Sequence, residues 1–287
     1  MHRLPALAVL AAALTLSACD AVDSSADTLT DEDLDDAAVV VASALALDGG
    51  GVLEDAAAVA SLAASVDAAG RSAGPDRPGC DNGLAFDEAS STWTVTIDCE
   101  RTSPGGRFSS EFDRVSTYQF FDADGNAQRE RADAASVNYD IVSGSTLFQS
   151  PRGTHALTSL GADLTATALD EDLVSVSGTY DRTGTDTLTT RRGERTVAYT
   201  LALALDDVQG PKTRVRSWRN AVGGTITGTL QSTITRTPAD GETIVREVDR
   251  TFTVTFLEDG NERVAEIEID RRRYRADVET GDIASIP

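Results

Sequence analysis

From residue 80 onward the chain alternates polar and apolar residues in short runs, and this period of two limits the folds open to it. In residues 92–99 the alternation is unbroken. Successive side chains of a strand point to opposite faces, so such runs predict strands with one apolar face. The dipeptides Asp124-Gly125, Asp240-Gly241 and Asp259-Gly260 separate runs of this kind and are typical of hairpin turns. The runs therefore predict a mainly β fold, an antiparallel meander of about ten strands over residues 80–287.

Two alanine-rich segments that precede the strands predict a pair of short α-helices. Thr30 is a candidate N-cap for a helix over residues 31–47, because the acids that follow it suit the positive end of a helix dipole. A second helix is predicted over residues 52–69 from an apolar stripe with helical spacing. We expect a helical hairpin over residues 30–70 and a turn-rich linker over residues 71–79. A sheet this wide must bury its apolar face by forming a barrel, a half-barrel or a sandwich, or by packing against the helices.

Two cysteines lie where a hairpin would bring them together. A turn at residues 88–91 places Phe86 opposite Trp93, and the same register places Cys80 opposite Cys99. Directly opposed residues of an antiparallel pair are close enough for a disulfide bond. Closing this loop would stabilise the fold by about 3 kcal/mol in the chain-entropy model. In an oxidising compartment the sequence therefore predicts a Cys80–Cys99 disulfide, and the alternative is two unpaired buried thiols.

The third cysteine closes the segment Leu16-Ser17-Ala18-Cys19, which follows a basic N-terminus and a short apolar run. This segment resembles the lipobox of bacterial lipoproteins. The resemblance implies that residues 1–18 are a removed signal peptide and that Cys19 carries a diacylglycerol and an amide-linked acyl chain such as palmitate. Residues 19–29 would then be the acylated cysteine and a flexible acidic tether. The alternative is an ordinary secretory signal with an unmodified Cys19.

The resemblance implies a place in the bacterial cell envelope, where two or three acyl chains would anchor the protein firmly. We expect the outer membrane or the cell surface rather than the inner membrane. The chain has a net charge of −22, which becomes −23 if residues 1–18 and their one arginine are removed. Such a surface repels nucleic acid and anionic lipid, so nonspecific binding of either is not expected and no nucleic-acid partner is predicted. The acidity indicates either a high-salt habitat or the codon bias of a GC-rich genome.

Few residues suit catalysis. His155 is the one histidine after the predicted signal peptide, which excludes a site with two histidines in one chain, and the familiar nucleophile and phosphate-binding motifs are absent. The acidic segment 122–126 resembles the start of a calcium loop but lacks its remaining ligands, so a hairpin turn is the preferred interpretation. Arg271, Arg273 and Arg275 form a local basic cluster that is a candidate contact for an anion or a lipid headgroup. The alternative is that their stems cover the sheet and pair with the abundant acids.

The sequence therefore predicts a lipid-anchored envelope protein with a non-enzymatic binding or structural role, without a metal or another cofactor. Its partners are the membrane, reached through the N-terminal lipid, and either a hydrophobic ligand or another envelope protein. Two alternatives remain open. One is a carrier of lipid or another hydrophobic molecule, held on a concave sheet face under the helices. The other is a hydrolase that uses a pair of carboxylates.

Overall fold

The predicted strands form a single antiparallel sheet in the computed structural model, which describes residues 29–46, 50–64, 79–169, 171–191, 193–212, 218, 223–259 and 262–286. The predicted signal peptide, Cys19 and most of the tether and linker lie outside the described residues. The elements are α1 (Asp31–Leu45), α2 (Val52–Ala64), β1 (Cys80–Asp87), β2 (Thr92–Thr102), β3 (Ser109–Phe121), β4 (Ala127–Gln128), β5 (Ser136–Ser150), β6 (Gly153–Thr167), β7 (Leu173–Thr190), β8 (Gly193–Pro211), β9 (Gly223–Pro238), β10 (Ile244–Asp259), β11 (Glu262–Ile269), β12 (Arg272–Ala276) and β13 (Ile283–Ile286).

The strands follow one another in chain order across the sheet, and only the short β4 lies off this path, paired with β3. The prediction of a mainly β, antiparallel meander with two N-terminal helices is confirmed. The described residues form thirteen strands rather than about ten, because β4, β12 and β13 contain only two, five and four residues. Runs this short are too brief for a periodic pattern to reveal.

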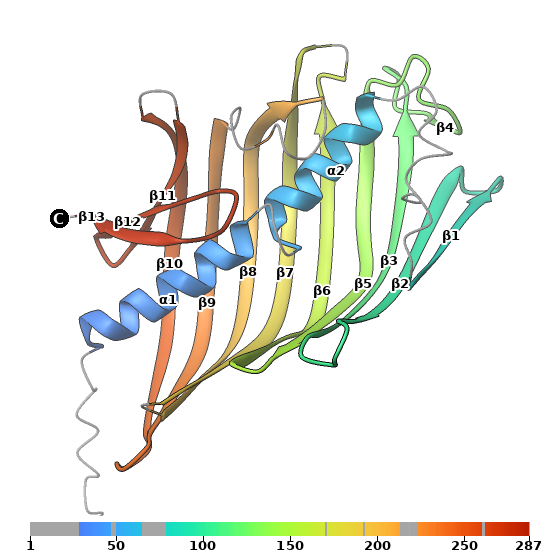
Figure 1. The fold of residues 1–287 in the computed structure, drawn as a ribbon. Helices are drawn as coiled ribbons and strands as arrows, with labels where there is room; N and C mark the ends of the chain where they lie inside the picture. Colours follow the sequence, from blue (N-terminus) through green and yellow to red (C-terminus); the bar gives the residue numbers. More distant parts are fainter. Residues whose placement is uncertain are drawn as a thin grey trace, which may run out of the picture.

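The sheet is strongly curved but stays open, so that β1 and β13 form two separate edges (Figure 1). Irregularities in register interrupt the β3–β5, β6–β7, β7–β8 and β8–β9 pairings. An extra residue in one strand of a pair bends it and increases its twist, which accounts for much of this curvature. Both helices lie on the concave side, where they cover the apolar face (Figure 1).

Helix α1 begins directly after its N-cap Thr30, as the sequence predicts. The Thr30 hydroxyl accepts a hydrogen bond from the Asp33 amide, and the Asp33 carboxylate accepts one from the Thr30 amide, forming a capping box. The helix ends at Leu45, two residues before its expected end. Helix α2 begins at Val52 as predicted and is described to Ala64, so the expected residues 65–69 lie outside the described chain.

The two helices are not packed side by side as the expected hairpin would be. Helix α1 contacts β9, β10, β11 and β13, whereas α2 contacts β5 to β8, so they follow one another across the concave face (Figure 1). Both are buried around most of their circumference, which their many alanines permit. The chain near Gly281 closes over α1, where a Cβ atom would lie 3.0 Å from the Ala42 carbonyl oxygen. Each helix thus buries its apolar surface against the sheet rather than against the other helix.

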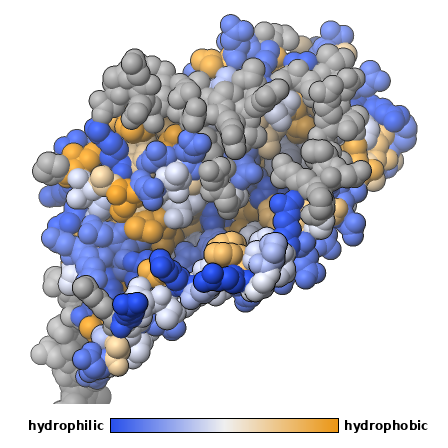
Figure 2. All heavy atoms as spheres, viewed as in Figure 1, coloured by the Kyte–Doolittle hydropathy of each residue, from blue (hydrophilic) through white to orange (hydrophobic). Residues whose placement is uncertain are grey.

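Figure 2 shows the side that carries the helices, where hydrophilic residues cover much of the visible surface and apolar residues show in patches between them. The inward positions of the strands are mainly apolar. In β8, Leu201, Leu203 and Leu205 are buried, while Thr200 and Ala204, which alternate with them, are exposed on the outer face. This alternation defines two faces of different chemistry: a concave apolar face and an outer face rich in threonine, alanine and acids.

Candidate functional site

A buried ion pair joins α2 to the concave face of the sheet. The guanidinium of Arg114 on β3 contacts the carboxylate of Asp55 on α2, and the Tyr180 hydroxyl donates a hydrogen bond of 3.0 Å to the same carboxylate. The side chains of Asp55 and Arg114 are only 1% and 10% exposed. Burial raises the pKa of Asp55, while Arg114 and Tyr180 favour its charged form. Because solvent scarcely reaches this centre, its role is to hold α2 in place rather than to react.

A second group of ion pairs joins α1 to the sheet in the same way. Arg236 on β9 donates to Asp33 at 2.9 Å and to Asp36 at 2.6 Å, and Arg195 on β8 also contacts Asp36. Burial alone would raise the pKa of Asp33, but hydrogen bonds from Thr30 and the charge of Arg236 outweigh burial and lower it. Both helices are therefore fixed to the sheet by aspartates that meet strand arginines.

The sequence did not predict these contacts, although charged residues at two inward positions indicate that buried partners are needed. Arg114 stands between Phe112 and Ser116 at an inward position of its strand, where a charged residue needs a buried partner. Asp55 lies within the apolar stripe of α2 in the same way. Acids in the first turn of a helix also interact favourably with its dipole. This explanation was sufficient for the aspartates at the sequence level, so their ion pairs with strand arginines were not predicted.

The outer face of the sheet carries a groove of about 780 Å³ that crosses β7 to β11. Its lining consists mainly of small and polar side chains: Thr179, Asp181, Ala202, Leu203, Ala204, Thr227, Gly228, Thr229, Thr251, Phe252, Thr253, Glu268 and Asp270. Gly228 is an inward position beneath this groove, and the Phe252 ring fills the concave side there, 2.5 Å from where a Cβ atom would lie. A volume of this size lies within the range of small-molecule sites, which makes the groove a candidate binding surface.

Three carboxylates line the groove, but they do not form the pair that a glycoside hydrolase needs. Asp181 lies on β7, whereas Glu268 lies on β11, four strands away. At the usual spacing this separation is about 19 Å, compared with the roughly 5–10 Å required. Asp270 is already paired with Arg250. The groove therefore suits binding better than acid–base catalysis.

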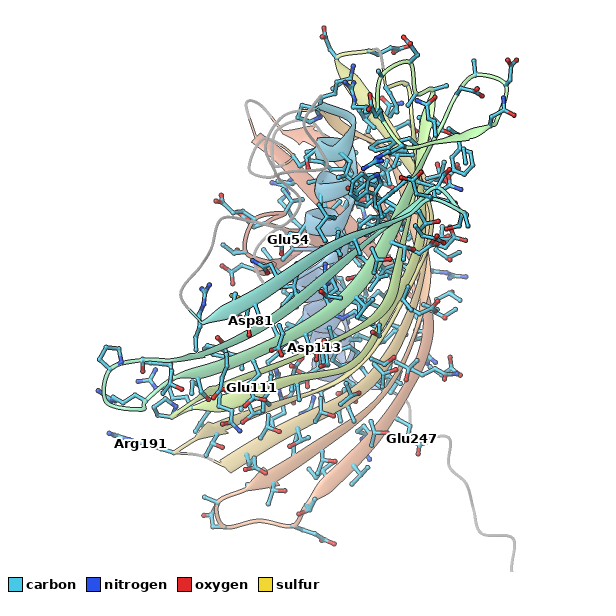
Figure 3. All side chains as sticks on the ribbon, turned by 90° about the vertical axis from the view of Figure 1, so that its right-hand side faces the viewer. Glu54, Asp81, Glu111, Asp113, Arg191 and Glu247 are labelled. Atoms are coloured by element: carbon cyan, nitrogen blue, oxygen red, sulfur yellow. A yellow bond between two sulfur atoms is a disulfide. The ribbon has the colours of Figure 1, made fainter. Side chains whose placement is uncertain are left out.

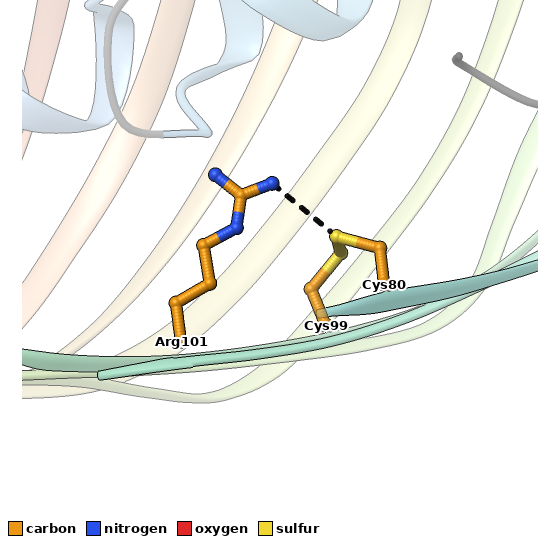
Figure 4. The surroundings of a disulfide bond; sticks show 3 residues. All are labelled: Cys80, Cys99 and Arg101. Carbon is orange, nitrogen blue, oxygen red and sulfur yellow. Dashed lines mark hydrogen bonds between the residues drawn. A yellow bond between two sulfur atoms is a disulfide. The ribbon is translucent and has the colours of Figure 1, made fainter. Parts of the chain in front are cut away.

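The predicted disulfide is present. Cys80 and Cys99 are register partners in the β1–β2 hairpin, together with Phe86 and Trp93, as the sequence predicts. Figure 4 shows the bond and the guanidinium of Arg101, which donates to the Cys80 sulfur at 3.4 Å. The bond ties the edge strand β1 to its neighbour.

The arginine cluster lies on and beside β12, next to the acids of β11. Arg273 faces Glu268 across the strand pair, and Arg275 faces Glu266. The Arg273 guanidinium also lies 3.7 Å from the Glu266 carboxylate, and Arg271 occupies the β11–β12 turn. These positions agree with the interpretation that the arginines pair with acids, and a role in anion or headgroup binding stays a prediction.

The other two candidate sites, His155 and residues 122–126, make contacts within the sheet and within a turn. His155 on β6 pairs with Asp186 on β7, and both side chains are about one-third exposed. At residues 122–126 the Asp122 carboxylate accepts hydrogen bonds from the amides of Asp124 and Asn126. A hydrogen bond from the Asn126 side chain, together with these two, lowers the pKa of Asp122 and closes the predicted turn. Among the described residues, no group of three or more histidine, cysteine or acidic side chains is arranged to hold a metal ion.

Exposed acids gather on the outer face of the first three strands. Asp81, Asp98 and Asp113 face one another across β1, β2 and β3, and Glu100 faces Glu111 in the next row. Figure 3 shows Asp81, Glu111 and Asp113 on these strands. Like charges in directly opposed positions repel, so this acidic patch destabilises the sheet unless ions screen it.

These features define a class of protein: an open, curved antiparallel sheet whose concave face holds two helices and whose outer face carries a polar groove. No protein-family model, no curated protein and no solved structure matches this chain. Within the described residues, neither helix has the length and apolar character needed to cross a bilayer. Any functional assignment therefore rests on the residues themselves.

Proposed function

We propose that this chain is a lipid-anchored protein of the bacterial cell envelope with a non-enzymatic binding role, and that the outer groove is its binding surface. The lipobox-like segment ending at Cys19 supports the anchor. The disulfide between Cys80 and Cys99 is consistent with an oxidising compartment outside the cytoplasm. The groove is the single observation that carries the binding role.

The chemistry of the groove limits its ligand. Threonine hydroxyls donate and accept hydrogen bonds, whereas the carboxylates of Asp181 and Glu268 only accept them. An anionic ligand would meet these carboxylates at close range, with an energetic cost. The groove therefore fits a polar ligand that is neutral or cationic and rich in hydrogen-bond donors, such as an oligosaccharide.

The alternative of a carrier for a hydrophobic molecule requires space between the helices and the concave face. In the described part of the chain, the residues that face each other there are tightly buried. Val41 of α1, Val59 of α2 and Leu230 of β9 are all fully buried. This observation favours the groove over a carrier site in the present arrangement of the helices.

The anchor is tested by the mass of the mature N-terminal peptide. We expect a peptide that begins at Cys19 and carries a diacylglycerol and one further acyl chain. The Cys19→Ser variant should lack the lipid and leave the membrane fraction. A wild-type chain that is uncut and unmodified would contradict the proposal.

The groove is tested by filling it. Thr229 lies at its centre, and Thr229→Trp should abolish binding of neutral oligosaccharides measured by calorimetry. Thr96→Trp is the matched control, because Thr96 is exposed on the same outer face but lies on β2, away from the groove. If both variants bind the oligosaccharides as the wild type does, or if the wild type binds none of them, the proposed role of the groove is wrong.

A further inference from the structure

One end of the sheet collects exposed apolar side chains. This end, which we call the rim, consists of the β2–β3, β5–β6, β7–β8 and β9–β10 hairpin ends and lies at the bottom of Figure 1. Of eight exposed large apolar side chains among the described residues, five belong to the rim: Phe108, Phe148, Leu188, Ile244 and Val245. The rings of Phe108 and Phe148 stack with centroids 6.5 Å apart. Such a concentration on a very polar protein marks an interaction surface.

The charges of the rim differ from those of the whole chain. Three of its four hairpin connections contain arginine and no acid, and the described arginines there are Arg107, Arg152 and Arg191. Figure 3 shows Arg191 at the tip of its hairpin. The fourth connection contains Asp240 and Glu242. Arginine beside exposed apolar groups suits the boundary between water and anionic lipid headgroups, because its stem lies along apolar surface while its charge meets phosphate.

The chain that leads to Cys19 begins near the same rim. Asp33 in the first turn of α1 is bonded to Arg236, and Arg236 is the register partner of the exposed Ile244. Leu29, where the described chain begins, lies ten positions after Cys19. Ten steps of chain span at most about 35 Å, so a lipid on Cys19 would hold Leu29, and with it this side of the sheet, near the bilayer.

From these three observations we propose that the rim docks onto the surface of an anionic lipid bilayer. The apolar side chains enter the headgroup region and the arginines bind lipid phosphates. The strands then rise away from the membrane. This inference rests on the proposed lipid anchor, which brings the chain to the bilayer but does not by itself decide which end of the sheet faces it.

Strand β7 offers a matched pair of positions for the test. Leu188 at the rim and Leu173 at the opposite end are 44% and 43% exposed, and they lie fifteen positions apart, about 50 Å along the strand. The full chain with Leu188→Cys or Leu173→Cys is labelled with bimane and reconstituted into vesicles of phosphatidylcholine and phosphatidylglycerol that contain nitroxide-labelled lipid. We expect several-fold stronger quenching at position 188 than at position 173. Wild-type chain labelled in parallel corrects for any label on Cys19.

The quenching ratio decides the inference. Equal quenching at the two positions, or stronger quenching at position 173, would overturn it. Bimane at position 188 that is shielded from aqueous iodide but not quenched by lipid nitroxide would also overturn it and would point to a second copy of the chain on the rim. The mass of the reconstituted chain is measured separately, so a missing lipid would refute the anchor at Cys19 without being confused with a wrong orientation. Replacing phosphatidylglycerol by phosphatidylcholine should weaken quenching at position 188, since the arginines would lose their anionic partner.

Discussion

The buried pair between Arg114 and Asp55 gives the sharpest test of how the helices are held. Arg114→Met keeps much of the length of the side chain but removes the ion-pair partner of the buried Asp55 carboxylate, which then keeps only the more distant charge of Arg182. Removing one member of a buried ion pair typically costs about 3–5 kcal/mol. For a domain of this size, that loss lowers the unfolding temperature by about 10 °C. Arg273→Met is the control, because Arg273 is half exposed and its contact with Glu266 is long, so we expect a loss of no more than about 0.5 kcal/mol.

The double variant Arg114→Met with Asp55→Asn separates the charge from the packing. It removes both charges and leaves an amide that can still accept the hydrogen bond of Tyr180, so it should recover about 2 kcal/mol relative to Arg114→Met alone. Urea unfolding followed by tryptophan fluorescence measures all three variants. The reasoning is refuted if Arg114→Met costs no more than Arg273→Met, or if the double variant is no more stable than the single one.

Two further predictions concern acid and salt. The lowered pKa of Asp33 means that its contribution to the free energy of unfolding is present above its ordinary pKa of 3.8 and is lost as the pH falls through the lower folded value. Urea midpoints between about pH 2 and 6 should therefore fall less steeply in Asp33→Asn than in the wild type, and parallel curves would contradict this. Asp98→Asn should stabilise the sheet by about 0.5 kcal/mol at low salt and by less in about 1 M NaCl, because it relieves the row formed with Asp81 and Asp113. Glu268→Gln should instead destabilise the sheet, and more so at low salt, since Glu268 faces Arg273. If both variants changed the free energy of unfolding in the same direction, these effects would not be electrostatic.

The register of the first hairpin could be predicted because several constraints agree there. A slip of one residue would turn Trp93 and Val95 to the outer face, and it would also separate Cys80 from Cys99. Thr30 could likewise be predicted as the N-cap of α1 from its own side chain and the acids that follow it, whereas the capping box with Asp33 was not predicted. Local signals of this kind do not need knowledge of distant contacts.

The openness of the sheet and the path of the helices could not be predicted in the same way. Curvature arises from register shifts such as the one after Asp206, which the polar and apolar pattern does not mark. The helices were expected to form a hairpin that packs on the sheet. Their places are instead set by Asp55 and Asp36, which meet arginines more than fifty residues away. A lone aspartate on a helix gives no indication of which strand carries its partner.

The rim and the groove, taken together, constrain the kind of ligand that an anchored chain could reach. Asp181 lines the groove on the same strand that carries Leu188 at the rim. Seven residues of extended strand separate them, which is about 23 Å. A rim that rests on the headgroups therefore holds the groove some 20 Å above the bilayer, facing sideways into the aqueous space. A lipid would have to leave the membrane to reach it, whereas a soluble or wall-bound polar ligand would not. The hydroxyl-rich lining of the groove is consistent with that location.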